Sequence, residues 1–116
     1  MARYEHLPLF KKAYDFKLYF VRLSRGLPKD FKYGLALEIR RLIAEIIDNI
    51  ILANNNVDKS EYLKKVLLII ERMKIKVRIL KDLGVIKTSS YKYIFESLIE
   101  ISKDTTAWKN WAKTEH

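Results

Sequence analysis

Apolar residues recur at alternating steps of three and four through residues 59–83, and this spacing restricts the possible folds more than any other feature. The recurring positions are Leu63, Val66, Ile70, Met73, Val77 and Leu80. Side chains at these steps share one face of an α-helix, which a helical bundle buries in its core. Neither glycine nor proline interrupts the segment. The pattern therefore predicts one long helix that packs against others.

Three further segments have a similar spacing, and short breaks separate the four. Gly26 and Pro28 end the first helix, the asparagines at 54–56 end the second, and Gly84 ends the third. Asp30 is expected to cap the second helix. The expected helices cover residues 7–25, 31–53, 59–83 and 89–113. Because such short links join antiparallel neighbours, the sequence predicts an all-α, up-down-up-down antiparallel four-helix bundle, with residues 1–116 as one domain.

The second helix is apolar over most of its circumference. Its polar stripe is limited to Glu38, Arg41, Glu45 and Asp48. A helix this apolar is either central in its own bundle or shared between subunits. We expect Ile43, Ile47 and Ile51 to contribute to an oligomer interface, with a generous monomer core as the alternative.

The net charge of +9 is unusual and is confined to two segments. Residues 1–30 contain seven Lys and Arg against three acidic residues, and residues 58–87 contain nine against four. Residues 31–57 and 88–116 are each balanced. A positive surplus on the first and third helices favours an anionic partner, with nucleic acid first among the candidates. The alternative is a solvated surface that keeps the protein soluble.

The cations of these two helices are the predicted nucleic-acid-binding residues. They are Lys11, Lys12, Lys17, Arg22, Arg25, Lys64, Lys65, Arg72, Lys74, Lys76, Arg78 and Lys81. Repeated cations suit sequence-independent contacts with the phosphates of RNA or DNA. Tyr4 and Tyr19 are candidate stacking groups near the first set, and Trp108 is interpreted as a packing anchor.

A second apolar row on the third helix lies opposite its core seam. The row consists of Leu68, Ile75 and Ile79. Exposed aliphatic rows at helical spacing mark partner surfaces, so we expect these residues to contact a second subunit or another protein. Isolated surface residues that the fold tolerates are the alternative. The row overlaps the cations Lys65, Arg72 and Lys76, so one neighbour cannot fully cover both.

Motifs for catalysis, metals and cofactors are absent from the sequence. It contains no cysteine, and no HExxH, P-loop or GxGxxG motif. Its two histidines, His6 and His116, lie near the chain ends, where side chains are usually solvated. We expect a protein that is not an enzyme and that needs no metal or cofactor.

The sequence also predicts no membrane attachment. No run approaches the roughly 20 apolar residues that a membrane-spanning helix needs. The residues before Pro8 include Arg3, Glu5 and His6 and lack the apolar centre of a signal peptide. We therefore expect a cytoplasmic protein.

Three stretches of the chain carry a family resemblance: LPKDFKYGLALEI (27–39), YLKKVLLIIERMKIKVRILKDL (62–83) and YKYIFESLIEISKDTTAW (91–108). They resemble the Avd-like family, the small four-helix accessory proteins of diversity-generating retroelements. These proteins are related to bundle proteins encoded in bacterial ribosomal RNA intervening sequences. The family's turn and helix start are matched by Pro28, Lys29, Tyr33, Gly34 and Leu35, and its ending by Glu100, Ile101, Lys103 and Trp108. Family glycines are replaced by Ser102, Thr106 and Ala107.

The resemblance implies a specific role. Avd-like proteins form a homopentameric, barrel-like ring with a positively charged surface. They bind the element's reverse transcriptase and nucleic acid, and support mutagenic copying of template RNA. The second helix and the row of Leu68, Ile75 and Ile79 would then build the ring, while the cations would serve the RNA and the polymerase. The alternative is an intervening-sequence-type bundle that acts as a general interaction or assembly module.

Overall fold

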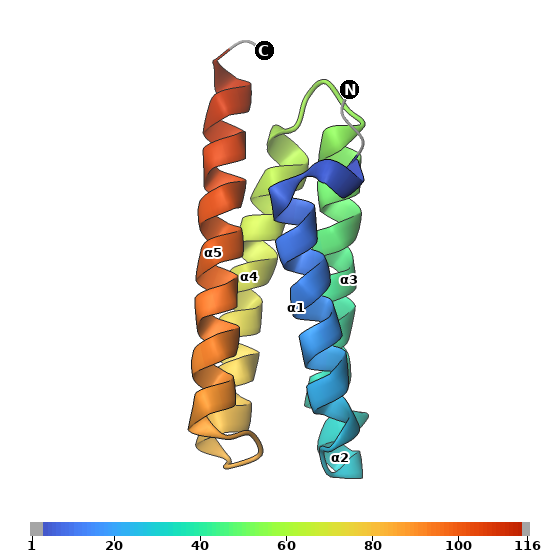
Figure 1. The fold of residues 1–116 in the computed structure, drawn as a ribbon, viewed down its shortest axis with the longest axis vertical. Coiled ribbons are helices and arrows are strands. Elements are labelled where there is room, and N and C mark those ends of the chain that lie inside the picture. The colour runs from blue at the N-terminus through green and yellow to red at the C-terminus, as the bar shows by residue number, and fades with distance from the viewer. Residues whose placement is uncertain (1–3, 115–116) are drawn as a thin grey trace.

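The computed structural model describes residues 4–114, which fold into an antiparallel bundle of four long helices (Figure 1). The long helices are α1 (Pro8–Arg25), α3 (Leu35–Asn54), α4 (Ser60–Asp82) and α5 (Thr88–Lys113). Two short elements, η1 (Tyr4–His6) and α2 (Lys29–Lys32), precede α1 and α3. Both α1 and α4 pack against α3 and α5, so α1 and α4 lie diagonally opposite each other. The predicted all-α, up-down-up-down four-helix bundle is confirmed.

The ends of three predicted helices agree with the structure to within one residue. Proline is accepted at the start of α1 because the first helical N–H groups have no partner within the helix. At the other end of the bundle, Gly84 follows α4 with a φ of 73°, a left-handed conformation that glycine adopts without strain. The Val85 N–H then donates to the Leu80 carbonyl oxygen at 2.9 Å, which closes the turn toward α5.

The predicted second helix, residues 31–53, is divided in the structure, and this prediction is corrected. The one-turn helix α2 ends before a turn at Gly34, and α3 begins at Leu35. Asp30 lies inside α2 and therefore does not cap α3. A Cβ atom on Gly34 would lie 2.5 Å from the Asp30 carbonyl oxygen. Only glycine allows the chain to pass so close to its own backbone without a shift.

The core runs along the centre of the bundle and contains the seam that the sequence predicts on α4. All six seam residues are 0% exposed. Phe16 and Phe20 reach them from α1, and Ile94 and Leu98 from α5. Each buried aliphatic or aromatic side chain of this kind stabilises the fold by about 1.5–3 kcal/mol relative to an exposed one.

The broad apolar face of α3 is explained largely by this core. Ile43 is 0% exposed inside the monomer, so its predicted role in an oligomer interface is wrong. Its side chain has no surface left to offer to a neighbouring subunit. Ile47 and Ile51 are half-buried, and Ile47 packs against the core. The predicted polar stripe of α3 is exposed at all four positions.

None of the helices in residues 4–114 combines the length and the hydrophobicity that crossing a membrane requires.

Candidate nucleic-acid interface

The predicted phosphate-binding cations lie on two separate surfaces. Those of the first helix are on α1 and those of the third are on α4, and α3 and α5 lie between these two helices (Figure 1). A strand bound along α4 would have to pass around α3 or α5 to reach α1. The two sets of cations therefore form two candidate sites, not one continuous site.

Five of the twelve predicted cations form ion pairs with carboxylates. The pairs are Lys11–Asp15 at 3.0 Å, Lys12–Asp104 at 2.8 Å, Lys74–Glu71 at 2.8 Å, Lys76–Glu38 at 3.0 Å and Arg78–Asp82 at 3.4 Å. Exposed ion pairs contribute only about 0–1 kcal/mol to stability. Each carboxylate nevertheless cancels much of the local positive potential. These five residues are weaker candidates for phosphate contacts than the sequence indicates.

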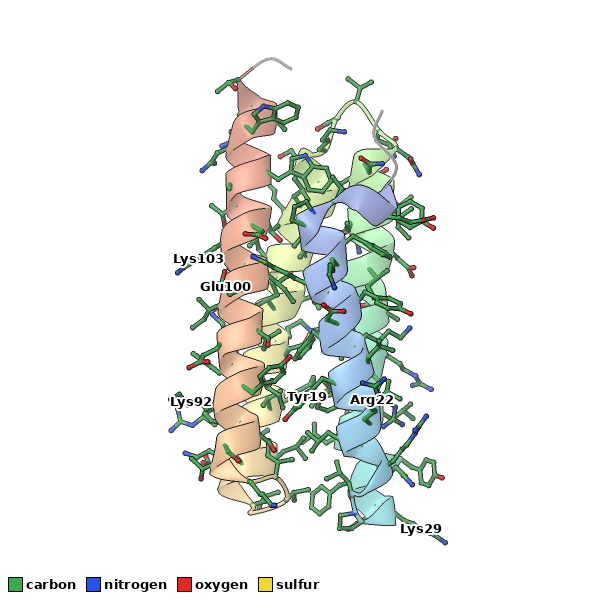
Figure 2. The ribbon with its side chains drawn as sticks, viewed as in Figure 1. Tyr19, Arg22, Lys29, Lys92, Glu100 and Lys103 are labelled. Atoms are coloured by element: carbon green, nitrogen blue, oxygen red, sulfur yellow. The ribbon has the colours of Figure 1, made fainter. Side chains whose placement is uncertain are left out.

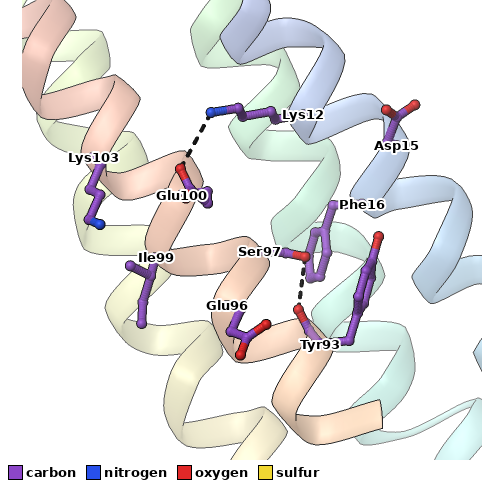
Figure 3. Close-up of a pocket in the computed structure, with 9 residues that line it drawn as sticks. All are labelled: Lys12, Asp15, Phe16, Tyr93, Glu96, Ser97, Ile99, Glu100 and Lys103. Atoms are coloured by element: carbon purple, nitrogen blue, oxygen red, sulfur yellow. Dashed lines mark hydrogen bonds and ion pairs between the residues drawn. The ribbon is translucent and has the colours of Figure 1, made fainter. Parts of the chain in front are cut away.

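Lys12 lies near two carboxylates, at a groove of about 520 Å³ between α1 and α5 (Figure 3). Its ammonium donates to Asp104 at 2.8 Å and lies 3.5 Å from Glu100. The hydrogen bond with Asp104 raises the pKa of Lys12 above its usual value, although partial desolvation opposes this. The groove is lined by both signs of charge, including Asp15 and Glu96 as well as Lys12 and Lys103. A mixed lining of this kind does not select an anion.

The other seven predicted cations have no carboxylate oxygen within 4.0 Å among residues 4–114. They are Lys17, Arg22 and Arg25 on α1, and Lys64, Lys65, Arg72 and Lys81 on α4. Lys17 and Lys81 are half-buried, and the remaining five are exposed. Arg22 projects outward from α1 in Figure 2. The exposed five retain their full charge for an external anion.

Three of these residues, Lys64, Lys65 and Arg72, form what we name the α4 cationic face. Steps of seven and eight residues, close to two helical turns, separate Arg72 from the two lysines, so the three lie on one side of α4. All three are exposed. The Lys65 ammonium lies 6.0 Å from the centre of the Tyr62 ring, which places an aromatic surface beside the cations.

The predicted outward row lies on the same side of α4. Leu68, Ile75 and Ile79 are 64%, 66% and 42% exposed, and Leu83 extends the row at 62%. Their exposure confirms that the row is outside the monomer core. Its role as an interface is still a prediction. Leu68 lies one turn from both Lys64 and Arg72, so a partner on the row and a strand on the cations would meet at the same surface.

The candidate stacking rings are already in contact with other aromatic rings. Tyr4 meets Phe10 edge-on, with ring centres 5.0 Å apart, and Tyr19 lies 4.3 Å from Tyr93. Both tyrosines are half-buried. Base stacking on either would have to displace an existing contact, so neither ring is a ready platform for a base.

Trp108 is half-buried and packs against the core, as the interpretation of it as an anchor predicts. The Lys59 ammonium lies 5.8 Å from the centre of the Trp108 ring.

No group of three or more His, Asp or Glu side chains is arranged to hold a metal ion in the described part of the chain. His116 and the side chain of His6 lie outside what the structure describes.

The sequence interpretation missed a cationic group at the opposite end of the bundle. Lys32 and Arg40 line a cavity together with Arg25. Counting charges by segment hides them, because residues 31–57 contain equal numbers of cations and acids. The turn at Gly34 brings the two residues together, and this turn is absent from the predicted helix.

Neither a scan against models of protein families nor a search of curated proteins finds a match to this chain. The resemblance to the Avd-like family stays a prediction. One of its motif positions has a clear structural reason in this chain, because Gly34 allows the close turn between α2 and α3. This reason concerns the local fold and is independent of any role.

Proposed function

We propose that this chain is a non-enzymatic bundle protein that binds nucleic acid through its phosphates. The supporting observation is the α4 cationic face, where three exposed cations on one side of a rigid helix have no carboxylate partner among the described residues. Phosphate contacts need repeated cations and no strict geometry, so this arrangement suits binding that is independent of base sequence. Arg22 and Arg25 on α1 supply a second, smaller surface.

The resemblance gives this proposal a biological setting. We propose that the chain acts as an accessory protein of a diversity-generating retroelement, where it binds the reverse transcriptase and supports mutagenic copying of template RNA. A homo-oligomer, a pentamer by analogy with the family, would repeat the exposed cations Arg22 and Arg25 of α1 around a ring, on the side of each subunit away from the outward row of α4. Repetition would strengthen binding to a long polyanion without any new contact within one subunit.

The salt dependence of RNA binding tests the core of this proposal. A fluorescent single-stranded RNA is titrated with the protein at several salt concentrations. Three phosphate contacts predict that log K falls linearly against log salt concentration, with a slope of about −2 for a single strand. Two RNAs of unrelated sequence should bind with similar affinity. Affinity that does not change with salt would contradict phosphate contacts.

A second candidate function is a general interaction or assembly module of the intervening-sequence type. The exposed row of Leu68, Ile75 and Ile79 favours it, because an aliphatic row beside charged residues is typical of a protein partner surface. The neighbourhood of the gene distinguishes the two settings. A reverse transcriptase gene with a template repeat supports the retroelement, and insertion in a ribosomal RNA gene supports the assembly module.

Sedimentation velocity tests whether the apolar row joins subunits. At micromolar concentration we expect a species larger than the 13.8 kDa monomer, and a Leu68→Gln/Ile75→Gln variant is expected to sediment as the monomer. Val57→Gln is the matched control, because this aliphatic residue is 92% exposed but lies outside the row. A monomeric wild-type protein would rule out self-association through α4 at that concentration.

A further inference from the structure

At the α2 end of the bundle, a small cavity has only cations among its charged lining residues. Its volume is about 190 Å³, which accommodates a tetrahedral oxyanion with a few waters. The lining residues are Val21, Ser24, Arg25, Lys32, Tyr33 and Arg40. Three of the six are cations and none is acidic. The larger groove between α1 and α5 has charges of both signs, so this cavity is the better anion site of the two.

The three cations come from three different elements that the turn at Gly34 brings together. Arg25 ends α1, Lys32 ends α2, and Arg40 lies in the second turn of α3. The Arg40 Nη2 atom donates a hydrogen bond to the Lys32 backbone carbonyl oxygen at 3.0 Å. This bond holds the guanidinium against the turn before any ligand arrives. A preorganised cation binds an anion at a lower entropic cost than a flexible one.

The other terminal nitrogen of the same guanidinium is unsatisfied. Arg40 Nη1 is buried and has no hydrogen-bond acceptor among residues 4–114. Leaving a buried donor of a charged group without an acceptor is unfavourable, and such atoms in folded proteins call for a specific explanation. The nearby charges of Arg25 and Lys32 add mutual repulsion. An oxyanion in the cavity would reduce the repulsion among the three cations.

We propose that this cavity binds a phosphate group. Planar guanidinium groups form paired hydrogen bonds with phosphate oxygens, and an ammonium adds a point charge. The two arginines and Lys32 supply both kinds of group around one small space. The cavity lies on α1, α2 and α3, away from the α4 cationic face, and it shares only Arg25 with the smaller surface of α1. Binding of inorganic phosphate there can be measured without RNA, so its outcome is separate from that of the function proposed above. The phosphate comes either from free inorganic phosphate or from the end of a nucleic-acid strand.

Titration with inorganic phosphate tests the site directly. Phosphate binding is measured by calorimetry and by thermal unfolding, with sodium chloride at equal ionic strength as the reference. Lys32→Gln and Arg25→Gln are each expected to raise the phosphate Kd about tenfold, the loss of one charge-assisted contact. Arg25→Gln changes α1 only, so it tests the site even if Lys32→Gln disturbs the turn.

Lys29→Gln is the matched control. Lys29 belongs to the same short helix as Lys32, is exposed, and projects outward from the α2 end of the bundle (Figure 2). Its replacement removes the same charge without touching the cavity, so phosphate binding should be unchanged. The proposal is overturned if Lys29→Gln weakens binding as much as Lys32→Gln. It is also overturned if phosphate stabilises the wild-type protein no more than chloride does.

A pair of short RNAs separates the two sources of phosphate. The strands have the same sequence, one with a 5′-phosphate and the other with a 5′-hydroxyl. Preference for the 5′-phosphate that disappears in Lys32→Gln assigns the cavity to a strand end. Equal affinity for the two RNAs, with the response to inorganic phosphate retained, assigns it to the free ion.

Discussion

Replacing Ile43 by aspartate is expected to unfold the bundle, whereas the same replacement at Ile75 leaves it folded. Ile43 is 0% exposed, in the middle of α3, and no cation among the other core residues is placed to pair with a new carboxylate. The variant loses about 1.5–3 kcal/mol of apolar burial and adds several kcal/mol for burying an unpaired charge or keeping it protonated. A domain of this size has roughly 5–15 kcal/mol of stability in total.

Circular dichroism during urea denaturation measures both effects. Ile75 is 66% exposed, so Ile75→Asp should change the free energy of unfolding by less than about 1 kcal/mol. Ile43→Val provides a graded control at the buried position, with an expected loss of about 0.5–1.5 kcal/mol. If Ile43→Asp unfolded at the same urea concentration as the wild-type protein, this face of α3 would not be buried in the monomer.

Helical periodicity predicts the bundle but does not distinguish a wide core from an interface. The α4 seam and Gly84 follow from local rules, since spacing and a glycine stop are visible in the sequence. Ile43 and Ile75 both lie on apolar stripes of helices. Only the packing of the helices in the folded bundle shows that Ile43 on α3 is buried and that Ile75 on α4 is exposed. The same limit explains the wrong assignment of Ile43.

The turn that begins α3 is not predictable from local propensity. Residues 31–53 contain one glycine and no proline, so a continuous helix from Asp30 is the natural expectation. The break depends on how close Gly34 passes to the Asp30 carbonyl oxygen, which is a property of the folded backbone. The cavity of Arg25, Lys32 and Arg40 depends on that break. It was therefore missed for the same physical reason.

Charge composition predicts the basic helices but not which cations are free. The pairs Lys11–Asp15 and Arg78–Asp82 have the i,i+4 spacing of helix neighbours and are visible in the sequence. The pairs of Lys12 with Asp104 and of Lys76 with Glu38 join different helices, so they depend on the tertiary fold. On α4, Lys74 and Arg78 pair with acids of the same helix and Lys76 pairs with Glu38 of α3. The candidate surface is thereby reduced chiefly to Lys64, Lys65 and Arg72.

Replacing Lys64, Lys65 and Arg72 together by glutamine is expected to weaken RNA binding roughly 10- to 100-fold at low salt. Each lost phosphate contact should reduce the steepness of the salt dependence by about 0.7, and hence by about 2 for all three. The three residues are exposed, so the free energy of unfolding should change by only a few tenths of a kcal/mol each. Fluorescence anisotropy across a salt series gives the affinity and the slope together.

A variant with glutamine at Lys11, Lys12 and Lys74 is the matched control, because it removes the same net charge from residues that already have carboxylate partners. If local contacts bind the RNA, this control should lose only about twofold in affinity and should keep most of the salt slope. Equal losses in the two variants would mean that RNA responds to the overall charge of the protein, and the α4 cationic face would not be a site. Wild-type binding by the α4 variant would instead direct attention to Arg22 and Arg25, on the other side of the bundle.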